Sequence, residues 1–228
     1  MKLSLVIPCF NEADNLAALV QRCAGALGEG VEFILVDNGS TDDTADRLPA
    51  LIADHPGIRS LRLADNAGYG GGILAGLAAG TGDVLGWTHA DGQTDPHDAM
   101  AALPLAGDAF VKGQRGGRPL RDVVFTWGMA AVEFGLLGTA MWDINGQPTL
   151  FPRAFYEGWV DPPTDFSLDL FAYQQAVQQG LPIRRIPVTF GPRLSGEGHN
   201  ETLAAKLRYS RRTLAYSVQL RRRLRARR

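Results

Sequence analysis

The chain has 228 residues, of which 45% are hydrophobic, and its formal net charge is −1. This length suits one globular domain of generous size, and the 27 glycines and 13 prolines are scattered along it, which excludes collagen-like and disordered classes. The two cysteines, Cys9 and Cys23, lie in segments that read as buried, which is typical of a reduced, cytoplasmic chain rather than a disulfide scaffold.

Strands and helices are predicted to alternate from the first residues onward. Short, mostly apolar runs that end in turn residues predict buried strands at Leu3–Ile7 and Val31–Val36, and we expect further strands at Ile58–Leu63 and Asp83–Trp87. Helical spacing predicts helices over 16–27, Thr41–His55 and Gly70–Ala79, and Pro49 is expected to break or bend the second of these. The alternation predicts an α/β fold with a mostly parallel sheet and helices on both faces.

The pattern changes in the second half of the chain. We expect a strand at Asp108–Val111, helices at Val123–Trp142 and Asp165–Gln179, a strand at Ile183–Thr189 and an amphipathic terminal helix over Thr202–Arg228. The segment Val123–Trp142 carries Glu133 as its only charge, but a carboxylate is costly at the centre of a bilayer. We therefore expect this helix to pack on the domain or to lie in a membrane interface rather than to span a membrane.

The charges of the chain are divided unevenly between its body and its end. Residues 206–228 contain ten Lys and Arg and no Asp or Glu, so the preceding 205 residues hold 13 basic against 24 acidic groups. Such a cationic tail predicts an anionic partner, either a membrane surface or nucleic acid, or it is a solvated helix end. Nucleic acid is disfavoured because the aromatic residues do not interleave with the arginines as stacking platforms require.

Polar loops follow each of the first four predicted strands, and in a parallel sheet such loops share the edge where ligands bind. Glu12 and Asp37, with the neighbouring amides, suit directional hydrogen bonds to a base and a ribose. The glycine-rich stretch "NAGYGGG" at residues 66–72 would let a backbone approach a phosphate near a helix N-terminus. In "HADGQ", Asp91 and Gln93 offer hard oxygen ligands for Mg²⁺ or Mn²⁺.

The segments "LSLVIPCFNEADNL", "EFILVDNGSTDDT", "NAGYGGGILAGLAAGTGDVLGWTHADGQTDP" and "VKGQR" together resemble glycosyltransferase family 2, which has the Rossmann-like GT-A fold. Within that family the chain is most similar to dolichol- and polyprenyl-phosphate sugar transferases, and the likeness continues through "DINGQPTLFPR" and "GPRLSGEGHN". The resemblance implies a GT-A domain over 1–201, with a nucleotide-sugar-binding half at 1–115 and an acceptor half at 116–201. The basic C-terminal helix occupies 202–228.

The resemblance further implies an inverting hexosyltransferase that moves a sugar from a GDP- or UDP-sugar to an acceptor, most naturally a polyprenyl phosphate. The residues that match the family's functional positions are, for the donor, Pro8, Asn11, Glu12, Asp37, Asn66, Gly68, Arg121 and Arg193; for catalysis, Asp91, Asp143 and Arg115; and for the metal, Asp91, Gln93 and His89. A polyprenyl phosphate oxygen is already anionic, so it needs no general base, whereas a hydroxyl acceptor does. For a hydroxyl, Asp143 is the first candidate base, ahead of Asp165 and Asp169.

One residue departs from the family pattern, because His89 stands where the family has the first acid of its Asp-x-Asp metal motif. Imidazole is a good ligand for Zn²⁺ or Mn²⁺ and a poor one for Mg²⁺. Three outcomes are open: metal binding through Asp91, Gln93 and donor oxygens; a preference for Mn²⁺ with His89 as a ligand; or loss of metal and catalysis.

The expected location is cytoplasmic, with peripheral attachment to the inner face of the cytoplasmic membrane through the basic helix and the apolar segment. Two alternatives to the lipid-phosphate transferase stay open. One is a soluble transferase that decorates a glycan, and the other is a catalytically impaired protein that only binds a nucleotide sugar.

Overall fold

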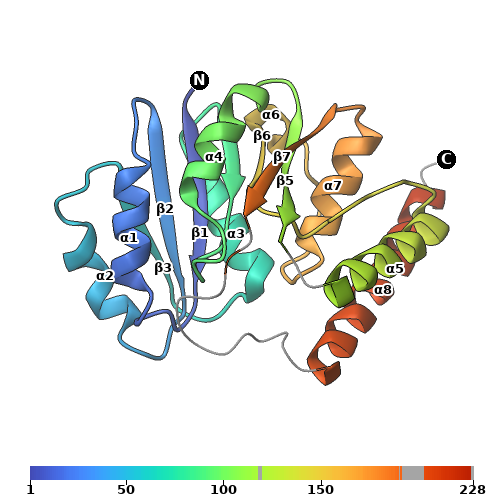
Figure 1. The fold of residues 1–228 in the computed structure, drawn as a ribbon, viewed down its shortest axis with the longest axis horizontal. Coiled ribbons are helices and arrows are strands. Elements are labelled where there is room, and N and C mark those ends of the chain that lie inside the picture. The colour runs from blue at the N-terminus through green and yellow to red at the C-terminus, as the bar shows by residue number, and fades with distance from the viewer. Residues whose placement is uncertain (118–119, 190, 192–202, 227–228) are drawn as a thin grey trace.

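The computed structural model describes residues 1–117, 120–189, 191 and 203–226, and it contains a seven-stranded sheet in the order β3-β2-β1-β4-β6-β5-β7 (Figure 1). The strands are β1 (Leu3–Cys9), β2 (Val31–Asn38), β3 (Ile58–Leu63), β4 (Val84–Trp87), β5 (Phe110–Gly116), β6 (Thr149–Pro152) and β7 (Ile183–Thr189). Every neighbouring pair is parallel except the two pairs that β6 makes with β4 and β5. The predicted α/β fold with a mostly parallel sheet is confirmed.

Strand β1 lies inside the sheet, between β2 and β4, and is buried on both faces. Leu5 and Ile7 belong to the core on one face, and Val6 between them belongs to the core on the other. A strand covered on both faces has no solvent side, which is why its sequence reads as a continuous apolar run rather than as an alternation. The two cores fix β1 and its neighbours, and with them the loops that follow.

The helices are α1 (Leu16–Gly25), α2 (Thr44–Ile52), α3 (Gly68–Ala79), α4 (Pro96–Ala102), α5 (Leu120–Leu137), α6 (Arg153–Glu157), α7 (Leu168–Gln178) and α8 (Leu203–Ala226), with a 3₁₀ turn at Leu103–Leu105. Helix α2 begins three residues later than predicted, because the amide groups of Ser40 and Thr41 donate to Asp37 and Asn11 instead of entering the helix. Pro49 lies inside α2 and does not end it.

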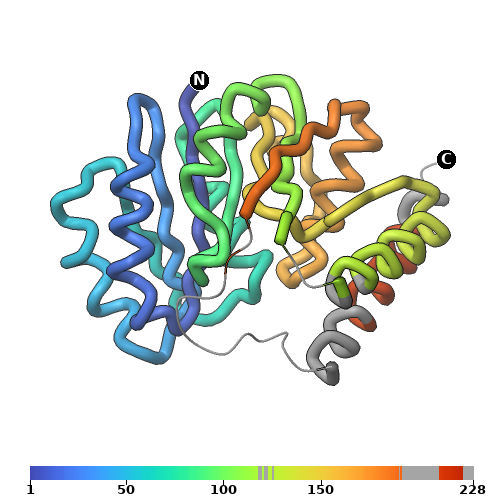
Figure 2. The backbone as a smooth tube through the Cα atoms, viewed as in Figure 1, coloured from blue at the N-terminus to red at the C-terminus, as the bar shows by residue number. Residues whose placement is uncertain are grey.

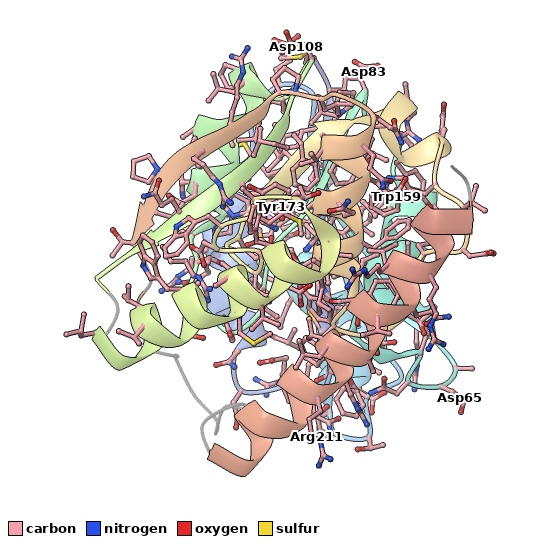
Figure 3. All side chains as sticks on the ribbon, turned by 90° about the vertical axis from the view of Figure 1, so that its right-hand side faces the viewer. Asp65, Asp83, Asp108, Trp159, Tyr173 and Arg211 are labelled. Atoms are coloured by element: carbon pink, nitrogen blue, oxygen red, sulfur yellow. The ribbon has the colours of Figure 1, made fainter. Side chains whose placement is uncertain are left out.

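The strands of the first half of the chain and those of the second half occupy opposite ends of the sheet, as the colours of Figure 2 show. Strands β2 and β3 lie on one side of β1, and strands β4 to β7 lie on the other. Helices α5 and α8 pack against each other at the far end of the second half, away from the sheet (Figures 1 and 3). Among the described helices none combines the length and apolarity needed to cross a membrane. The division at residues 201 and 202 stays a prediction.

Candidate functional site

The predicted site loops lie along one edge of the sheet, where the arrows of β1, β5 and β7 end in Figure 1. Because β1 to β4 are mutually parallel, the loops after them share this edge, and hydrogen bonds join them directly. The Thr41 amide donates to Asn11 Oδ1 at 2.8 Å, which ties the loop after β2 to the loop after β1. Asn38 Nδ2 donates to the Gly68 carbonyl at 3.0 Å, which ties the same loop to the one after β3.

The donor side of this edge is built around Asp37 at the end of β2, whose side chain is buried. Its Oδ1 accepts the Ser40 amide at 3.0 Å, and its Oδ2 lies 3.5 Å from Arg62 Nε, with no hydrogen-bond donor for that oxygen among the described residues. This oxygen is therefore paired with the Arg62 guanidinium rather than hydrogen-bonded, and the contact of Asp37 with a nucleotide stays a prediction. Asn11 beside it has a φ of +56°, a conformation that non-glycine residues adopt chiefly in turns and functional sites.

The other two predicted nucleotide contacts are held by neighbouring side chains. The Glu12 amide donates to Thr44 Oγ1 at 2.9 Å, and Glu12 Oε2 accepts Asn15 Nδ2 at 2.5 Å. Pro8 is half-buried on β1, where it pairs with Val36 of β2. These positions are next to Asn11 and Asp37, but the contacts of Pro8 and Glu12 with a nucleotide stay predictions.

The glycines at the start of α3 make room for another part of the chain. The Gly71 amide donates to the Thr164 carbonyl at 2.9 Å, and a Cβ on Gly68 would lie 2.6 Å from the same oxygen. The Gly68 amide donates to Asn66 Oδ1 at 2.8 Å. Close packing against residues 163–165 therefore explains these glycines without a phosphate, and the donor-binding roles of Asn66 and Gly68 stay predictions.

The "HADGQ" loop after β4 carries one carboxylate, that of Asp91, which is 7% exposed and accepts the Gln93 amide at 3.1 Å. Gln93 Nε2 donates to the Gly191 carbonyl at 3.2 Å. The His89 ring lies 6.0 Å from the Tyr69 ring of α3. Within the described ranges no three His, Cys, Asp or Glu side chains gather as a metal site. The loop is therefore not a complete metal site on its own.

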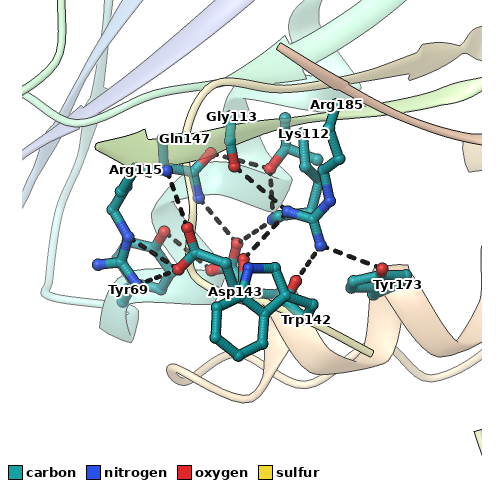
Figure 4. Close-up of polar contacts among 11 residues, drawn as sticks. Tyr69, Lys112, Gly113, Arg115, Trp142, Asp143, Gln147, Tyr173 and Arg185 are labelled. Atoms are coloured by element: carbon teal, nitrogen blue, oxygen red, sulfur yellow. Dashed lines mark hydrogen bonds and ion pairs between the residues drawn. The ribbon is translucent and has the colours of Figure 1, made fainter. Parts of the chain in front are cut away.

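The acceptor side is built on a buried ion pair between Asp143 and Arg115 (Figure 4). Asp143 Oδ1 accepts Arg115 Nε at 2.9 Å and Nη2 at 2.5 Å, and Oδ2 accepts the Arg115 amide at 3.0 Å. Asp143 is 1% exposed, and its φ of +45° marks a strained backbone. The sequence separates these two residues by 28 positions, and the structure brings them together. Their catalytic roles stay predictions.

A second buried network fixes the elements around that pair. Lys112 Nζ of β5 donates to Asp169 Oδ1 at 3.1 Å and to Thr149 Oγ1 at 2.7 Å. Gln147 Nε2 donates to the same Asp169 oxygen at 2.8 Å, and the Tyr69 hydroxyl donates to Asp169 Oδ2 at 3.1 Å. Burial lowers the pKa of Lys112 to about 8, although the charge of Asp169 opposes this shift. Burial, with the charge of Asp169, raises the pKa of Tyr69 well above its usual value.

Arg185 of β7 holds the loop that carries Asp143 (Figure 4). Its guanidinium donates to the carbonyls of Gly113, Trp142 and Asp143 and to the Tyr173 hydroxyl, the last at 3.0 Å. Arg185, Lys112, Gln147 and Tyr69 are not among the site residues predicted from the sequence. For Lys112 a signal existed, because a lysine directly after the apolar residues of "AFVKG" falls inside a buried strand.

The positions of two arginine side chains predicted to bind the donor are not described by the structure. Arg193 lies outside the described residues, and Arg121 lies in α5 with its side chain outside the described part. Asp165, a candidate base, is exposed, and its Oδ1 accepts the Ser167 amide at 2.9 Å ahead of α7. This bond closes a turn ahead of α7, and a role for Asp165 as a base stays a prediction.

Comparison with known proteins gives matches in both sequence and fold. The family model "Glycosyl transferase family 2" matches residues 4–157. Over 114 residues, 48% of this chain, the sequence is 36% identical to an undecaprenyl-phosphate 4-deoxy-4-formamido-L-arabinose transferase of Serratia proteamaculans, and it is 34% identical to the protein of the same name from an Enterobacter species. The match spans 35% of the length of each of these relatives.

Among solved structures, the chain resembles glucosyl-3-phosphoglycerate synthase of Mycobacterium tuberculosis, with a TM-score of 0.69 and 21% identity over 96% of this chain and 79% of that one. That structure contains Mn²⁺ and UDP, and another structure of the same enzyme, with a TM-score of 0.69 and 22% identity over the same shares, contains Mg²⁺ and UDP. The likeness confirms the expected GT-A fold. Since the family model covers residues 4–157, which is most of the chain, the chain belongs to glycosyl transferase family 2.

Proposed function

We propose that this protein transfers a sugar from a nucleotide diphosphate donor to a polyprenyl phosphate, with inversion at the anomeric carbon. The choice of acceptor rests on the ion pairs of the two buried carboxylates of the acceptor half. Asp143 is paired with the half-buried Arg115, and Asp169 is paired with the buried Lys112. A hydroxyl acceptor must lose its proton to a base. A phosphate oxygen is anionic already, and it is an acceptor that an arginine held by Asp143 suits.

The donor's nucleoside lies, in this proposal, against Asp37, Asn11 and Glu12 at the ends of β1 and β2. In this position Asp37 Oδ2, which lies 3.5 Å from Arg62 Nε, would accept a hydrogen bond from a base or ribose. The UDP in the similar solved structures favours UDP over GDP as the carrier, and the named relatives favour undecaprenyl phosphate as the acceptor.

In the reaction, an oxygen of the lipid phosphate attacks the anomeric carbon of the sugar. The new carbon–oxygen bond forms as the bond to the nucleoside diphosphate breaks, and the leaving group departs with the bonding electron pair. The work for the protein is to orient two anions that repel each other and to stabilise the charge of the one that leaves. Arg115 donates three hydrogen bonds to Asp143, which hold it in place. It thus supplies a positioned positive charge at this edge.

A divalent cation, when bound, would neutralise charge on the departing diphosphate. The described residues do not by themselves form a complete site for it, because the "HADGQ" loop offers one carboxylate and one amide oxygen. We propose that Asp91 and Gln93 bind Mg²⁺ or Mn²⁺ only together with oxygens of the donor diphosphate.

His89→Asp is expected to raise the affinity for Mn²⁺ in the presence of UDP by about tenfold or more, because it adds a second hard anionic ligand beside Asp91. Free Mn²⁺ measured by electron paramagnetic resonance gives the affinity without any need for turnover. His89→Asn is the matched control, since it removes the imidazole without adding a charge. Equal Mn²⁺ affinity in all three proteins would contradict the metal site proposed at this loop.

The donor and acceptor are tested together by a panel of UDP-, GDP- and dTDP-sugars, first in thermal unfolding and then in transfer assays. At about 100 times its dissociation constant a true donor stabilises the fold by about 2.7 kcal/mol, which raises the melting temperature measurably. We expect transfer to a short-chain isoprenyl phosphate and none to sugar hydroxyls. Transfer to a sugar hydroxyl would favour the soluble glycan-decorating enzyme, and donor binding without turnover would favour a binding protein.

For location, we propose peripheral attachment at the inner face of the cytoplasmic membrane, where a lipid phosphate and a soluble nucleotide sugar can meet. The ten basic residues of 206–228 support this placement.

A further inference from the structure

Helix α5 exposes an apolar stripe. Leu120, Val124, Trp127 and Phe134 are 77%, 61%, 62% and 55% exposed. They recur at i, i+4, i+7 and i+14, with the exposed Ala131 between the last two, so they share one side of the helix. In a water-soluble protein a stripe with this spacing faces the core, and here it faces outward.

Two polar side chains of this helix pair are turned inward. Glu133 of α5 and Ser217 of α8 are both 0% exposed at the place where the two helices pack. Burial raises the pKa of Glu133, which indicates a carboxyl group removed from water. An apolar stripe left exposed on α5, beside a buried carboxyl group, is a surface that an apolar environment would complete.

The charge on α8 identifies that environment. The chain from 206 onward carries ten basic residues and no acidic ones, and the exposed Arg211 and Arg212 lie on α8, which runs beside α5 (Figure 3). An apolar stripe next to a dense positive charge matches the interface of an anionic bilayer, where each Lys or Arg contributes about 1 kcal/mol. A second copy of the chain would bring this positive charge against itself.

We propose that α5 and α8 together form a docking surface that lies flat on an anionic lipid leaflet, with Trp127 at the level of the headgroups. Tryptophan favours that level of a membrane. The Trp127 ring meets the Trp142 ring edge to face at 4.4 Å between centroids, and Trp142 directly precedes Asp143. The stripe on α5 is thus joined through one aromatic contact to the loop that positions Arg115.

This docking surface would also lead the lipid phosphate of the acceptor from the headgroup layer to Arg115, an inference that rests on the proposed function. The lipid phosphate of the acceptor lies in the headgroup layer, and the docking surface brings that layer beside the Arg115–Asp143 pair. A polyprenyl phosphate would then reach Arg115 while its chain stays in the leaflet alongside Trp127 and Trp142. Membrane attachment and acceptor binding become parts of one surface.

The test uses the full chain with vesicles of phosphatidylcholine containing phosphatidylglycerol, against phosphatidylcholine alone. Wild-type protein should sediment with the anionic vesicles at low salt and detach in high salt, with a blue shift of tryptophan fluorescence. Val124→Ser together with Phe134→Ser should lower the partition coefficient by about tenfold or more. Val160→Ser, a control at a 60% exposed valine outside α5, should sediment like wild type.

Three results would overturn the inference: no sedimentation of wild type with anionic vesicles, equal partitioning of the double variant, or a dimer in sedimentation velocity that this variant converts to a monomer. The last result would make a second copy the occupant of the stripe. Transfer to a short-chain isoprenyl phosphate in solution, measured with wild type in parallel, reports on the proposed function separately. Transfer without vesicle binding would contradict the docking surface alone, and vesicle binding without transfer would contradict the function alone.

Discussion

Asp169→Ala is expected to lower the free energy of unfolding by about 3–5 kcal/mol at pH 7, because it leaves a buried ammonium group without its counter-charge. Lys112 is 0% exposed, and Asp169 is its one carboxylate partner among the described residues. The same change strands the buried amide of Gln147 and the hydroxyl of Tyr69, which donate to that carboxylate. Urea unfolding followed by circular dichroism measures the loss.

The double variant Lys112→Met with Asp169→Leu is the control that separates a stranded charge from general damage. Replacing both partners of a buried pair by apolar residues of similar volume is often close to neutral, so most of the lost stability should return. A double variant no more stable than Asp169→Ala would show that the ion pair is not the cause.

The pH dependence gives an independent check on Lys112. Its pKa is about 8 in the folded protein against 10.5 for an ordinary lysine. Between these two values the unfolded chain binds more protons than the folded one, so the contribution of Lys112 to the free energy of unfolding rises with pH across this window. Lys112→Met should remove that rise, and an unchanged pH profile would contradict the shifted pKa.

The sheet and its binding edge could be predicted from the sequence because they depend on local patterns. The bounds predicted for β3, Ile58–Leu63, are those of the structure, since turn residues flank this segment on both sides. Asp37 and Asp91 were selected because they follow strands that are buried on both faces, and parallel strands place such residues on the same edge.

The elements and contacts that the sequence did not indicate depend on segments that are far apart in the chain or are too short to show a periodic pattern. Strand β6 has four residues and enters the sheet antiparallel between β4 and β5, a pairing that no local pattern encodes. Helices α4 and α6 are seven and five residues long, too short for helical periodicity to be evident. Asp169 was selected as a candidate base from its type, but its partners Lys112 and Tyr69 lie 57 and 100 positions away.

The glycines of α3 illustrate the same limit at a single site. Their clustering predicted a close approach of something to the backbone, and a close approach is what the structure contains. The approaching group is the backbone of 163–165, nearly 100 residues further along the chain, where the sequence suggested a phosphate. A glycine cluster thus predicts proximity, and the identity of the neighbour comes from the fold.

Arg115→Ala is expected to lower kcat/KM for transfer to an isoprenyl phosphate by about 10²–10³-fold, the usual effect of removing a preorganised charge from a reacting anion. The guanidinium is held by the buried Asp143 and is 16% exposed, so water cannot simply replace it. The kcat/KM of Arg115→Lys should fall between those of wild type and Arg115→Ala. Lysine keeps the positive charge but lacks the planar guanidinium that binds two oxygens at once. Initial rates at several acceptor concentrations separate kcat from KM.

Arg184→Ala is the matched control, since this arginine of β7 is 43% exposed, pairs with the exposed Asp108 at 3.7 Å, and lies opposite Val111 rather than at the binding edge. It should keep kcat/KM within about twofold of wild type, as loss of a surface ion pair does. Comparable losses in the Arg184 and Arg115 variants would remove the case for a special role of Arg115.

Asp143→Asn distinguishes a phosphate acceptor, which needs no general base, from a hydroxyl acceptor, which does. If Asp143 positions Arg115, the amide retains one hydrogen-bond acceptor for the guanidinium, and the variant should keep part of its activity with an unchanged dependence of kcat on pH. If Asp143 were a general base for a hydroxyl, the amide could not take the proton, and the acidic limb of the pH profile would disappear with nearly all of the rate. The two carboxylate oxygens already accept three donors from Arg115. A base must have a lone pair directed at the acceptor, and a carboxylate committed in this way favours the first outcome.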